Sequence, residues 1–394
     1  MSAHFPFKQW LTAGQPAEVE RLMKAAAERD DVISFAGGLP ADDLFPTEAM
    51  TDTLARVMAE HGREVLQYHW ADGYGPLREQ IVEVMRGRGV SVRTGELLIT
   101  HGAQQALDLL ARLFLRTGDP LGIERPTYAA AIQVFKLQRP KLCPIARSEA
   151  GLDLDAARAV AQDTRPNLLY LAPAGHNPIG DALTPATCER LIALAAAHDA
   201  FIVEDDAYGS IQFDGPRPPL RAYPGAEERV VYVGTFSKVL TPGLRVGWIV
   251  APRTVIDQLL LLKAAADLQT SSLSQIVLST YLREHDLGEH LGRCLQSYRE
   301  RRDATLSALQ EHMQGVMRWT RPSSGFSVWA TLADGRSSVD LLATALAHDV
   351  AFEPGAAFFP TDPEPHHLRL SFSNLRPAQI SEGVRRLADA LRAG

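Results

Sequence analysis

Residues 230–247 read Val230-Val-Tyr-Val-Gly-Thr-Phe-Ser-Lys-Val-Leu-Thr-Pro-Gly-Leu-Arg-Val-Gly247. An apolar strand here runs directly into a short polar turn, and the turn presents a single lysine, Lys238. A lysine held near apolar side chains has a lowered pKa, so its amine can form a Schiff base. The hydroxyls of Thr235 and Ser237 and the guanidinium of Arg245 surround that amine with groups that suit a phosphate. An imine-forming amine beside a phosphate site points to pyridoxal 5'-phosphate as the cofactor.

The sequence around this stretch alternates short apolar runs with helical periods. A helix is expected over 103–115, and another is expected to begin with Thr184 as its N-cap and Pro185 as its first residue. The expected strands cover residues 97–100, 120–124, 167–172, 201–204, 230–234 and 246–250. Strands that are apolar on both faces and are separated by helices predict a mostly parallel sheet that is covered on both sides.

The last part of the chain has a different pattern. Residues 326–332 alternate like a half-exposed strand, a helix is expected over 338–347, and strands are expected near 351–353 and 368–373. A final helix places Ile380, Val384, Leu387 and Leu391 on one stripe, and residues 251–320 are a helix-rich connector. We therefore expect an N-terminal arm (1–45) that packs with the small domain, a large cofactor-binding domain (46–290) and a small α+β domain (291–394).

Composition excludes several classes of protein. The chain has 394 residues, of which 46% are hydrophobic and 22% charged, as is ordinary for a soluble globular protein. Its net charge of −7, without a basic run, argues against a nucleic-acid partner, and no apolar stretch reaches the roughly 20 residues of a membrane span. Three scattered cysteines, with no CxxC or HExxH spacing and no evident signal peptide, predict a cytoplasmic protein without a metal site.

Two further features near strand ends suit the same cofactor. Gly102-Ala103-Gln104 follows a strand and opens a helix, whose free N–H groups and positive dipole end can bind phosphate. The acids Asp205 and Asp206 follow the strand at 201–204, and either of them could keep a pyridine nitrogen protonated. A helix cap or a solvated acidic turn is the simpler reading of these two acids.

Three more residues have a functional and an ordinary reading. Asn177 follows the strand at 167–172 and could donate to a phenolate oxygen, although Asn-Pro also favours turns. Tyr128 follows the strand at 120–124 and could stack on a flat ring, or it could be a core tyrosine. Arg369 lies in an apolar strand, where it could bind a substrate carboxylate with two hydrogen bonds or face water from an edge strand.

Taken together, these pieces resemble the fold-type I pyridoxal phosphate enzymes, specifically the class I/II aminotransferases. The resemblance is strongest to the branch that contains the 2-aminoadipate aminotransferases and the aminotransferase-like half of the MocR regulators. It extends from about residue 30 to the C-terminus. The pieces that carry it are Ile33-Ser-Phe-Ala-Gly-Gly-Leu-Pro40, Gly73-Tyr-Gly-Pro-Leu-Arg78, Leu98-Ile-Thr-His-Gly-Ala-Gln-Gln-Ala-Leu-Asp108, Asn177-Pro-Ile-Gly180, Val203-Glu-Asp-Asp-Ala-Tyr208, Gly234 to Gly247 and Leu368-Arg-Leu-Ser-Phe372.

The resemblance implies a role for each site residue. Lys238 holds the cofactor as a Schiff base and moves the proton, and Asp205 pairs with the pyridine nitrogen. Asn177 and Tyr208 bind the ring hydroxyl, and Tyr128 stacks on the ring. Arg369 binds the substrate α-carboxylate, Asn177 and Gly38 also lie against the substrate, and Tyr68 reaches the phosphate of the neighbouring subunit in a homodimer. The phosphate is held by Ala103, Gln104, Thr235, Ser237 and Arg245.

The resemblance also implies an architecture and a reaction. The large domain carries a mostly parallel seven-stranded sheet, and the C-terminal domain is a smaller α+β unit. The enzyme moves an amino group between an α-amino acid and a 2-oxo acid. A racemase, cyclase, lyase or decarboxylase would use the same early carbanion. A non-catalytic regulator domain is a remote alternative, because only about 30 residues precede the match and they are not basic, unlike the DNA-binding region of the regulators.

Several positions depart from the family pattern and leave the substrate open. These positions are expected near the substrate side of the pocket, and they are His69, Trp70, His176, Ile179 and Ser324. Arg21 could bind a distal acid of a substrate, but an arginine on a solvated helix is the more ordinary reading. The sequence therefore predicts the cofactor chemistry without naming the amino donor or acceptor.

Overall fold

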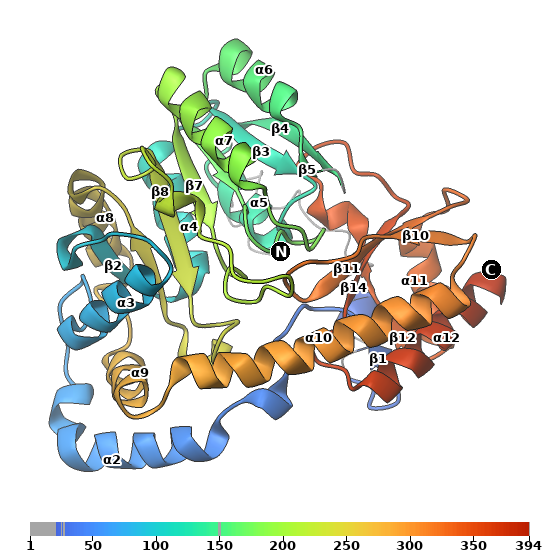
Figure 1. Cartoon of the computed structure of the whole chain (residues 1–394), viewed down its shortest axis with the longest axis horizontal. Coiled ribbons are helices and arrows are strands. Elements are labelled where there is room, and N and C mark those ends of the chain that lie inside the picture. Colours follow the sequence, from blue (N-terminus) through green and yellow to red (C-terminus); the bar gives the residue numbers. More distant parts are fainter. Residues whose placement is uncertain (1–20, 25, 27, 149–150, 394) are drawn as a thin grey trace, which may run out of the picture.

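Two β-sheets, one of eight strands and one of four, organise the computed structural model (Figure 1). The structure describes residues 21–24, 26, 28–148 and 151–393. Residues 1–20 of the expected N-terminal arm lie outside the described residues.

The large sheet is mostly parallel, as the sequence predicted. Strands β4, β3, β6, β7 and β8 run parallel to one another, while β9 is antiparallel to both β8 and β2. An eighth strand, the two-residue β5, extends the expected seven by pairing antiparallel to the end of β4. In spatial order the strands are β2 (Leu97–Thr100), β9 (Gly247–Val250), β8 (Val230–Thr235), β7 (Phe201–Asp205), β6 (Leu168–Leu171), β3 (Pro120–Arg125), β4 (Lys141–Ser148) and β5 (Gly151–Leu152).

Helices cover both faces of this sheet because its strands are apolar on both sides. In β6, Leu168 and Tyr170 pack in one cluster, and Leu169 and Leu171 pack in another. The first cluster includes α4 (Gly102–Phe114), α5 (Ala129–Lys136) and α8 (Arg253–Asp267). The second includes α6 (Leu154–Thr164) and α7 (Pro185–Ala197), whose N-cap Thr184 accepts from the N–H of Thr187 as expected.

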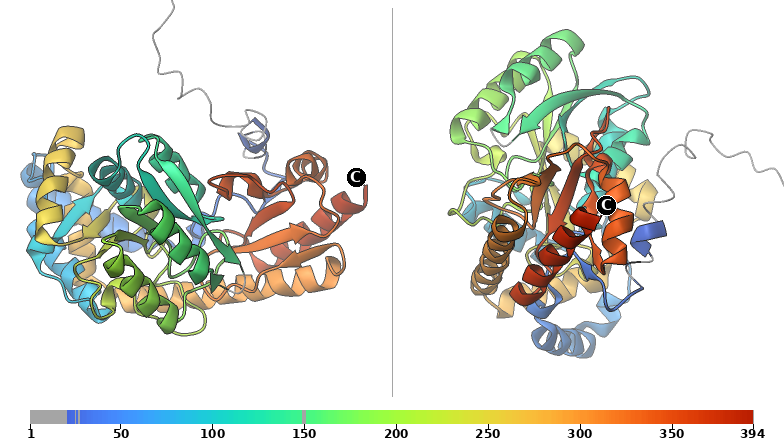
Figure 2. Two further views of the ribbon diagram at one scale, coloured as in Figure 1. Left: turned by 90° about the horizontal axis from the view of Figure 1, so that it is seen from above. Right: turned by 90° about the vertical axis from the view of Figure 1, so that its right-hand side faces the viewer.

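The small sheet is antiparallel and lies at the other end of the molecule (Figure 2). Its strands, in spatial order, are β10 (Met317–Trp319), β11 (Ser327–Leu332), β14 (His367–Ser371) and β13 (Glu353–Pro354). Helix α11 (Ser338–Ala347) follows β11, and α12 (Pro377–Ala393) buries Ile380, Val384 and Leu387 as the sequence predicted. A separate parallel pair joins β1 (Ile33–Ser34), near the start of the described chain, to β12 (Val350–Ala351).

Helices connect the two sheets. The longest of those described, α10 (Leu287–His312), runs from the region of α9 (Ser272–Glu284) beneath the large sheet to α12 beside the small sheet (Figures 1 and 2). Helix α2 (Thr47–Val65) packs against α9, as does α3 (Gly75–Gly87). Short 3-10 turns cover Asp42–Leu44, Thr94–Glu96, Leu220–Ala222, Pro242–Leu244 and Gly355–Phe358.

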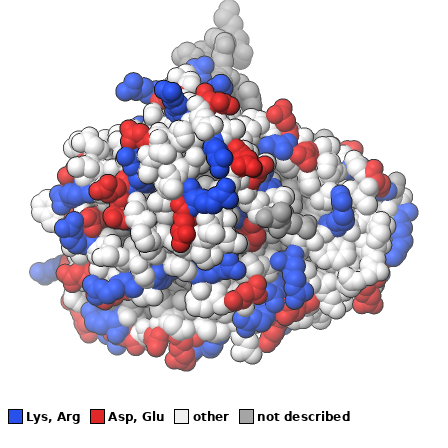
Figure 3. Space-filling view, turned by 45° about the horizontal axis from the view of Figure 1, so that its top comes forward, with Lys and Arg blue, Asp and Glu red and all other residues white. Residues whose placement is uncertain are grey.

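The surface and the cysteines agree with the composition. Acidic and basic side chains are interspersed on the face drawn in Figure 3. No helix among the described residues is long and apolar enough to span a bilayer. Cys143, Cys188 and Cys294 are buried and free.

Candidate active site

The predicted site residues converge because they follow the ends of neighbouring strands. Lys238 follows β8, Asp205 ends β7, Asn177 follows β6 and Tyr128 follows β3. The carboxyl ends of parallel strands meet at one edge of a sheet, and ligands of open α/β sheets bind there. Together with Arg369 from the small sheet, these side chains line one cavity of about 480 Å³.

Lys238 projects into this cavity, where few groups stabilise a positive charge on its amine. Its Nζ donates to the carbonyl oxygen of Gly38 at 3.0 Å and lies 5.8 Å from the centre of the Tyr208 ring. Burial lowers the pKa of Lys238 to about 8, and the nearby cations Arg369 and Arg245 contribute in the same direction. About a tenth of this amine is therefore neutral near pH 7, and the neutral amine is the form that attacks a carbonyl carbon.

An anion site lies beside this lysine at the start of α4. Ala103 and Gln104, in the first turn of α4, line the cavity next to Thr235 and Ser237. Thr235 Oγ1 donates to Ser237 Oγ at 2.9 Å, and Arg245 Nη1 donates to the same Ser237 oxygen at 3.4 Å. A helix N-terminus, two hydroxyls and an arginine form a set of donors that binds phosphate.

A glycine allows the helix to approach this close. A Cβ atom at Gly247 in β9 would lie 2.7 Å from the carbonyl carbon of Gly102 and 2.8 Å from the nitrogen of Ala103. A side chain there would push the start of α4 away from the sheet. The anion site therefore depends on a residue that does not line it.

The structure shows which of the two adjacent acids, Asp205 or Asp206, faces the cavity, a choice that the sequence left open. Asp205 lines the cavity, and its Oδ2 accepts a 2.7 Å hydrogen bond from the hydroxyl of Tyr170. Asp206 points away from the cavity and is paired with Arg88 and with the hydroxyl of Tyr232. Successive side chains of a strand point to opposite faces, so only one of the two acids can face the site.

Burial sets the chemistry of Asp205. Burial raises the pKa of Asp205 to about 6, against the opposing effect of the Tyr170 hydrogen bond. Within the described residues, its Oδ1 atom is buried without a hydrogen-bond donor. A buried carboxylate oxygen in this condition favours a ligand that brings a positively charged N–H group.

Arg369 is buried, and its partner belongs to the protein. It lies on β14, an inner strand of the small sheet, and its side chain is only 5% exposed, so it is not the water-facing edge arginine. Its Nη1 donates to Asn177 Oδ1 at 3.0 Å, and its Nη2 is hydrogen-bonded to Glu353 on β13. We expected a substrate carboxylate to supply the counter-charge, whereas the carboxylate of Glu353 already supplies it.

A glycine segment covers the cavity between these groups. Gly37 and Gly38 have φ angles of 88° and 60°, which glycine adopts without strain. A Cβ at Gly38 would lie 3.3 Å from Arg369 Nη2. The segment is held by β1 and by a hydrogen bond from the N–H of Ser371 to the carbonyl oxygen of Phe35, 2.7 Å long. Gly38 thus lies next to both Lys238 and Arg369, and its contact with the substrate stays a prediction.

Two of the three tyrosines predicted for the site line the cavity, and the third does not. Tyr128 and Tyr208 both face the cavity, and burial raises the pKa of each hydroxyl. Tyr68 is 74% exposed and lies outside the lining. The structure of one chain therefore brings together every predicted site residue except Tyr68.

The positions that depart from the family pattern do not themselves line the cavity of this chain. His176 and Ile179 are buried, Ser324 is fully buried, and Trp70 is 81% exposed. His69 contacts Tyr74 and Gln269 at the surface loop instead. Arg21 is exposed and is likewise absent from the lining.

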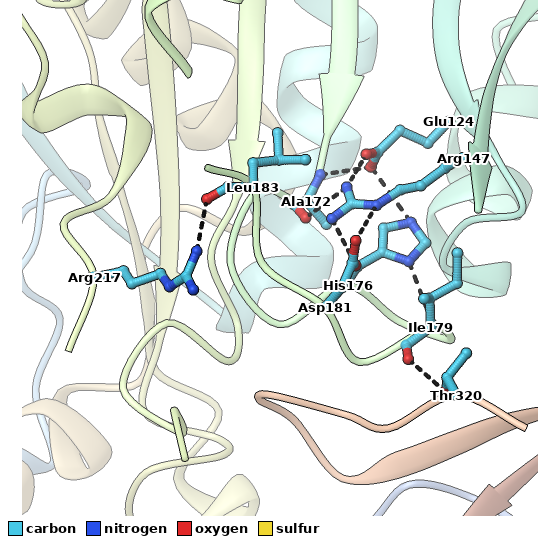
Figure 4. Close-up of polar contacts among 9 residues, drawn as sticks. All are labelled: Glu124, Arg147, Ala172, His176, Ile179, Asp181, Leu183, Arg217 and Thr320. Atoms are coloured by element: carbon cyan, nitrogen blue, oxygen red, sulfur yellow. Dashed lines mark hydrogen bonds and ion pairs between the residues drawn. The ribbon is translucent and has the colours of Figure 1, made fainter. Parts of the chain in front are cut away.

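A buried charge cluster supports the loop that carries Asn177 (Figure 4). Arg147 on β4 is paired with Glu124 at the end of β3 and, at 2.7 Å, with Asp181. Glu124 also accepts a 2.7 Å hydrogen bond from the N–H of Ala172, where β6 ends. Burial raises the pKa of Glu124 while Arg147 opposes the rise, and burial holds the pKa of His176 well below its ordinary value. The cluster joins three strand ends at the position from which the Asn177 loop begins.

Removing the cation of this cluster should destabilise the protein strongly. Arg147→Met would leave the fully buried carboxylate of Glu124 without its counter-charge, so we expect the free energy of unfolding to fall by about 3 kcal/mol. Urea unfolding followed by circular dichroism measures this loss. Arg158→Met is the control, because Arg158 is exposed and should change stability by no more than about 0.5 kcal/mol. Equal stability of the two variants would contradict a structural role for the cluster.

The lining fits pyridoxal phosphate on three independent grounds. The anion site at α4 matches its phosphate, the unpartnered Asp205 oxygen matches its protonated ring nitrogen, and the Lys238 amine matches its aldehyde. Tyr128, beside these groups in the lining, suits the face of its ring. These fits use groups that lie at separate positions around the same cavity.

Sequence reasoning missed two residues of the lining that form hydrogen bonds with predicted site residues. Tyr170 positions Asp205, and Glu353 is paired with Arg369. Tyr170 is a polar residue in an apolar strand, and Glu353 directly follows the apolar residues 350–352, and these positions were the only signals available. Strand pairing supplies what the sequence did not show: Glu353 lies directly opposite Arg369 in the register of β13 and β14.

Comparisons with known proteins identify the family of this chain. The family model of the class I and II aminotransferases matches residues 30–387. A 2-aminoadipate transaminase of Thermus thermophilus is 41% identical, over 96% of this chain and 94% of its own. An aromatic-amino-acid aminotransferase of Thermococcus litoralis is 37% identical, over 98% and 94%.

A solved structure matches along nearly the whole chain. LysN, an α-aminoadipate aminotransferase from Thermus thermophilus crystallised with N-(5'-phosphopyridoxyl)-L-leucine, superposes with a TM-score of 0.90 at 39% identity. The match covers 98% of this chain and 97% of that one. The chain therefore belongs to the class I and II aminotransferases, the fold-type I enzymes that transfer amino groups with pyridoxal phosphate.

Proposed function

We propose that Lys238 is the residue through which this aminotransferase bonds its cofactor and moves an amino group from an α-amino acid to a 2-oxo acid. The observation that carries the proposal is the position of its amine in the cavity, with a pKa of about 8 and no carboxylate partner among the described residues. Arg369 is assigned to the substrate α-carboxylate, and the anion site at α4 to the cofactor phosphate.

The bound cofactor supplies an electron sink next to the substrate Cα, which no side chain provides. The side chains perform the remaining work. Asp205 keeps the ring nitrogen protonated, and Asn177 and Tyr208 are assigned to the ring hydroxyl. Lys238 Nζ, as a neutral amine, would take the proton from the substrate Cα and deliver it to the former aldehyde carbon of the cofactor, since it lies in the same cavity as Arg369. The Gly37–Gly38 segment helps to exclude water above these groups.

Borohydride reduction followed by peptide mapping tests the first assignment. We expect a pyridoxyl label on Lys238 and on no other lysine. Incubation with single amino acids, followed by the absorption of the cofactor, then tests amino-group transfer. Product formation without conversion of the cofactor to its amine form would indicate one of the other reactions on the same carbanion.

The pKa of Lys238 predicts how fast the cofactor-free protein captures pyridoxal phosphate. Because only the neutral amine attacks the aldehyde, the capture rate should rise about tenfold per pH unit up to pH about 8 and then level off. Stopped-flow absorption measures this rate, with Lys238→Ala as the blank. A rate that continues to rise with the same slope well above pH 8 would contradict a lowered pKa.

We also propose that two chains form a homodimer in which Tyr68 serves the partner's site. Leu66, Tyr68 and Trp70 are 73%, 74% and 81% exposed, which is unusual for large apolar side chains close together. A second hollow contains Gln104 and Arg245, which also line the first cavity, and Gln269, which contacts the loop of Tyr68. Sedimentation equilibrium should give the mass of two chains, and Trp70→Asp should shift the equilibrium toward one chain.

The location of the protein in the cell and the boundaries of its domains are also proposals. Three buried, free cysteines suit the reducing cytoplasm. The division into an arm (1–45), a large domain (46–290) and a small domain (291–394) is supported by the separation of the two sheets. Limited proteolysis would test these boundaries.

A further inference from the structure

Glu353 is a charge in the cavity that the proposed transfer leaves without a partner. The charged residues of the lining are Lys238, Arg245, Arg369, Asp205 and Glu353. Under the proposed function, which this inference presupposes, the first four bind the aldehyde, the phosphate, the substrate α-carboxylate and the ring nitrogen. Glu353 alone has no assigned group, and among the described residues it is paired with Arg369, the residue assigned to the substrate.

The backbone prevents Glu353 from leaving the site. Glu353 and Arg369 are direct cross-strand partners in the antiparallel pair of β13 and β14. The Arg369 guanidinium is fixed further by Asn177 at 3.0 Å and by the ring of Phe358, whose centre is 4.9 Å from Arg369 Cζ. The Glu353 side chain is 27% exposed, so it can rotate about its own bonds while its Cα stays in place.

Substrate binding then creates an excess of negative charge. A substrate α-carboxylate on Arg369 places a second carboxylate beside the one already present, and a single guanidinium neutralises only one of them. A side-chain carboxylate on the substrate would increase the excess, whereas a positively charged side chain would remove it. In the part of the chain that the structure describes, the buried Nε atom of Arg369 has no acceptor, so the guanidinium still has a free donor for an incoming carboxylate.

We propose that Glu353 determines donor specificity: it favours α-amino acids whose side chain carries an ammonium or guanidinium group and disfavours dicarboxylic amino acids. Glu353 turns from Arg369 to the distal cation of the donor as the donor's α-carboxylate takes its place on Arg369. Before the donor binds, Glu353 and Arg369 are paired with each other. In the complex, Arg369 binds the α-carboxylate of the donor and Glu353 binds its distal cation.

Glu353→Gln in the holoenzyme tests this proposal, with Glu228→Gln as the matched control at an exposed position outside the lining. Lysine, norleucine and 2-aminoadipate share a carbon chain and differ in side-chain charge. The rate of the first half-reaction, followed by cofactor absorption, gives kcat/KM for each donor. We expect Glu353→Gln to lower the lysine-to-norleucine ratio about tenfold and to raise the 2-aminoadipate-to-norleucine ratio about tenfold. Glu228→Gln should change neither ratio.

Binding of non-reacting analogues supplies a readout that does not depend on turnover. In calorimetric titrations with ε-aminocaproate, hexanoate and adipate, which lack the α-amino group, the wild type should bind ε-aminocaproate most tightly and adipate least tightly. Glu353→Gln should lower the affinity for ε-aminocaproate relative to hexanoate and raise the affinity for adipate relative to hexanoate. A uniform loss across all three analogues and all three donors would mean that Glu353 only orients Arg369, and it would overturn the proposal. Unchanged ratios would overturn it as well.

The failure of the proposed function would look different. If the wild-type enzyme converts no donor and borohydride leaves no label on Lys238, the proposal of amino-group transfer at this site is wrong. If norleucine is converted normally but Glu353→Gln changes neither the lysine-to-norleucine nor the 2-aminoadipate-to-norleucine ratio, only the specificity proposal is wrong. The calorimetric order of the analogues decides the specificity proposal in either case.

Discussion

Lys238→Ala is expected to lower the rate of amino-group transfer by about 10⁴-fold, because the variant loses both the amine that bonds the cofactor and the base at the substrate Cα. The single-turnover half-reaction with norleucine measures this rate, and borohydride mapping should show no pyridoxyl label. The amine makes one hydrogen bond, to the Gly38 carbonyl, so the loss should not come from unfolding. We expect the cofactor-free variant to keep its stability within about 1 kcal/mol.

Lys136→Ala is the matched control for this variant. Lys136 is exposed at the end of α5 and lies outside the cavity lining. Its replacement should leave both the half-reaction and the label at Lys238 unchanged. A Lys238→Ala enzyme that retained a rate within about tenfold of the wild type would require another base and would contradict the assignment.

Asp205→Asn should cost about 10³-fold in the same half-reaction, because a neutral amide does not stabilise a positive charge on the ring nitrogen. The substitution keeps the size of the side chain and can keep the hydrogen bond to Tyr170. The cofactor should still bind, since its phosphate is assigned to the separate anion site at α4. Cofactor absorption and the rate of conversion by norleucine check the two expectations separately.

The neighbouring acid provides a sharp comparison. Asp206→Asn changes the next residue along the chain but alters the buried pair with Arg88 on the other side of the strand. We expect it to reduce the free energy of unfolding by about 3 kcal/mol and to slow the half-reaction by less than about tenfold. If Asp206→Asn proved the more damaging to catalysis and Asp205→Asn to stability, the assignment of the two acids would be reversed.

The periodicity of the sequence predicted the layers of this fold well. Residues such as Leu168 to Leu171 are apolar on both faces, and the structure places alternate residues in the two clusters on either side of the sheet. The strand β4 was not predicted because Pro144 interrupts its pattern and a proline weakens the case for a strand. The eighth strand β5 is too short to have a period of its own.

The sequence predicted the site less evenly. Residues that follow strand ends, such as Lys238 and Asn177, could be found because a parallel sheet gathers those ends at one edge. The choice between Asp205 and Asp206 depends on which face of β7 borders the cavity, and sequence alone does not record that. The pairing of Glu353 with Arg369 depends on the register of two strands of the small sheet. Its two residues are separated by a 3-10 turn and a loop, so no local pattern connects them.

The pairing of β1 with β12 has a mechanical consequence for catalysis. It ties the glycine segment above Lys238 to the same sheet region that carries Arg369, and the hydrogen bond between Ser371 and Phe35 reinforces the tie. A hinge movement of the small sheet away from the large one would therefore move the glycine segment and Arg369 away from Lys238 together. Entry of the donor and release of the oxo acid would then depend on the same domain movement, and the frequency of that movement would limit the turnover rate.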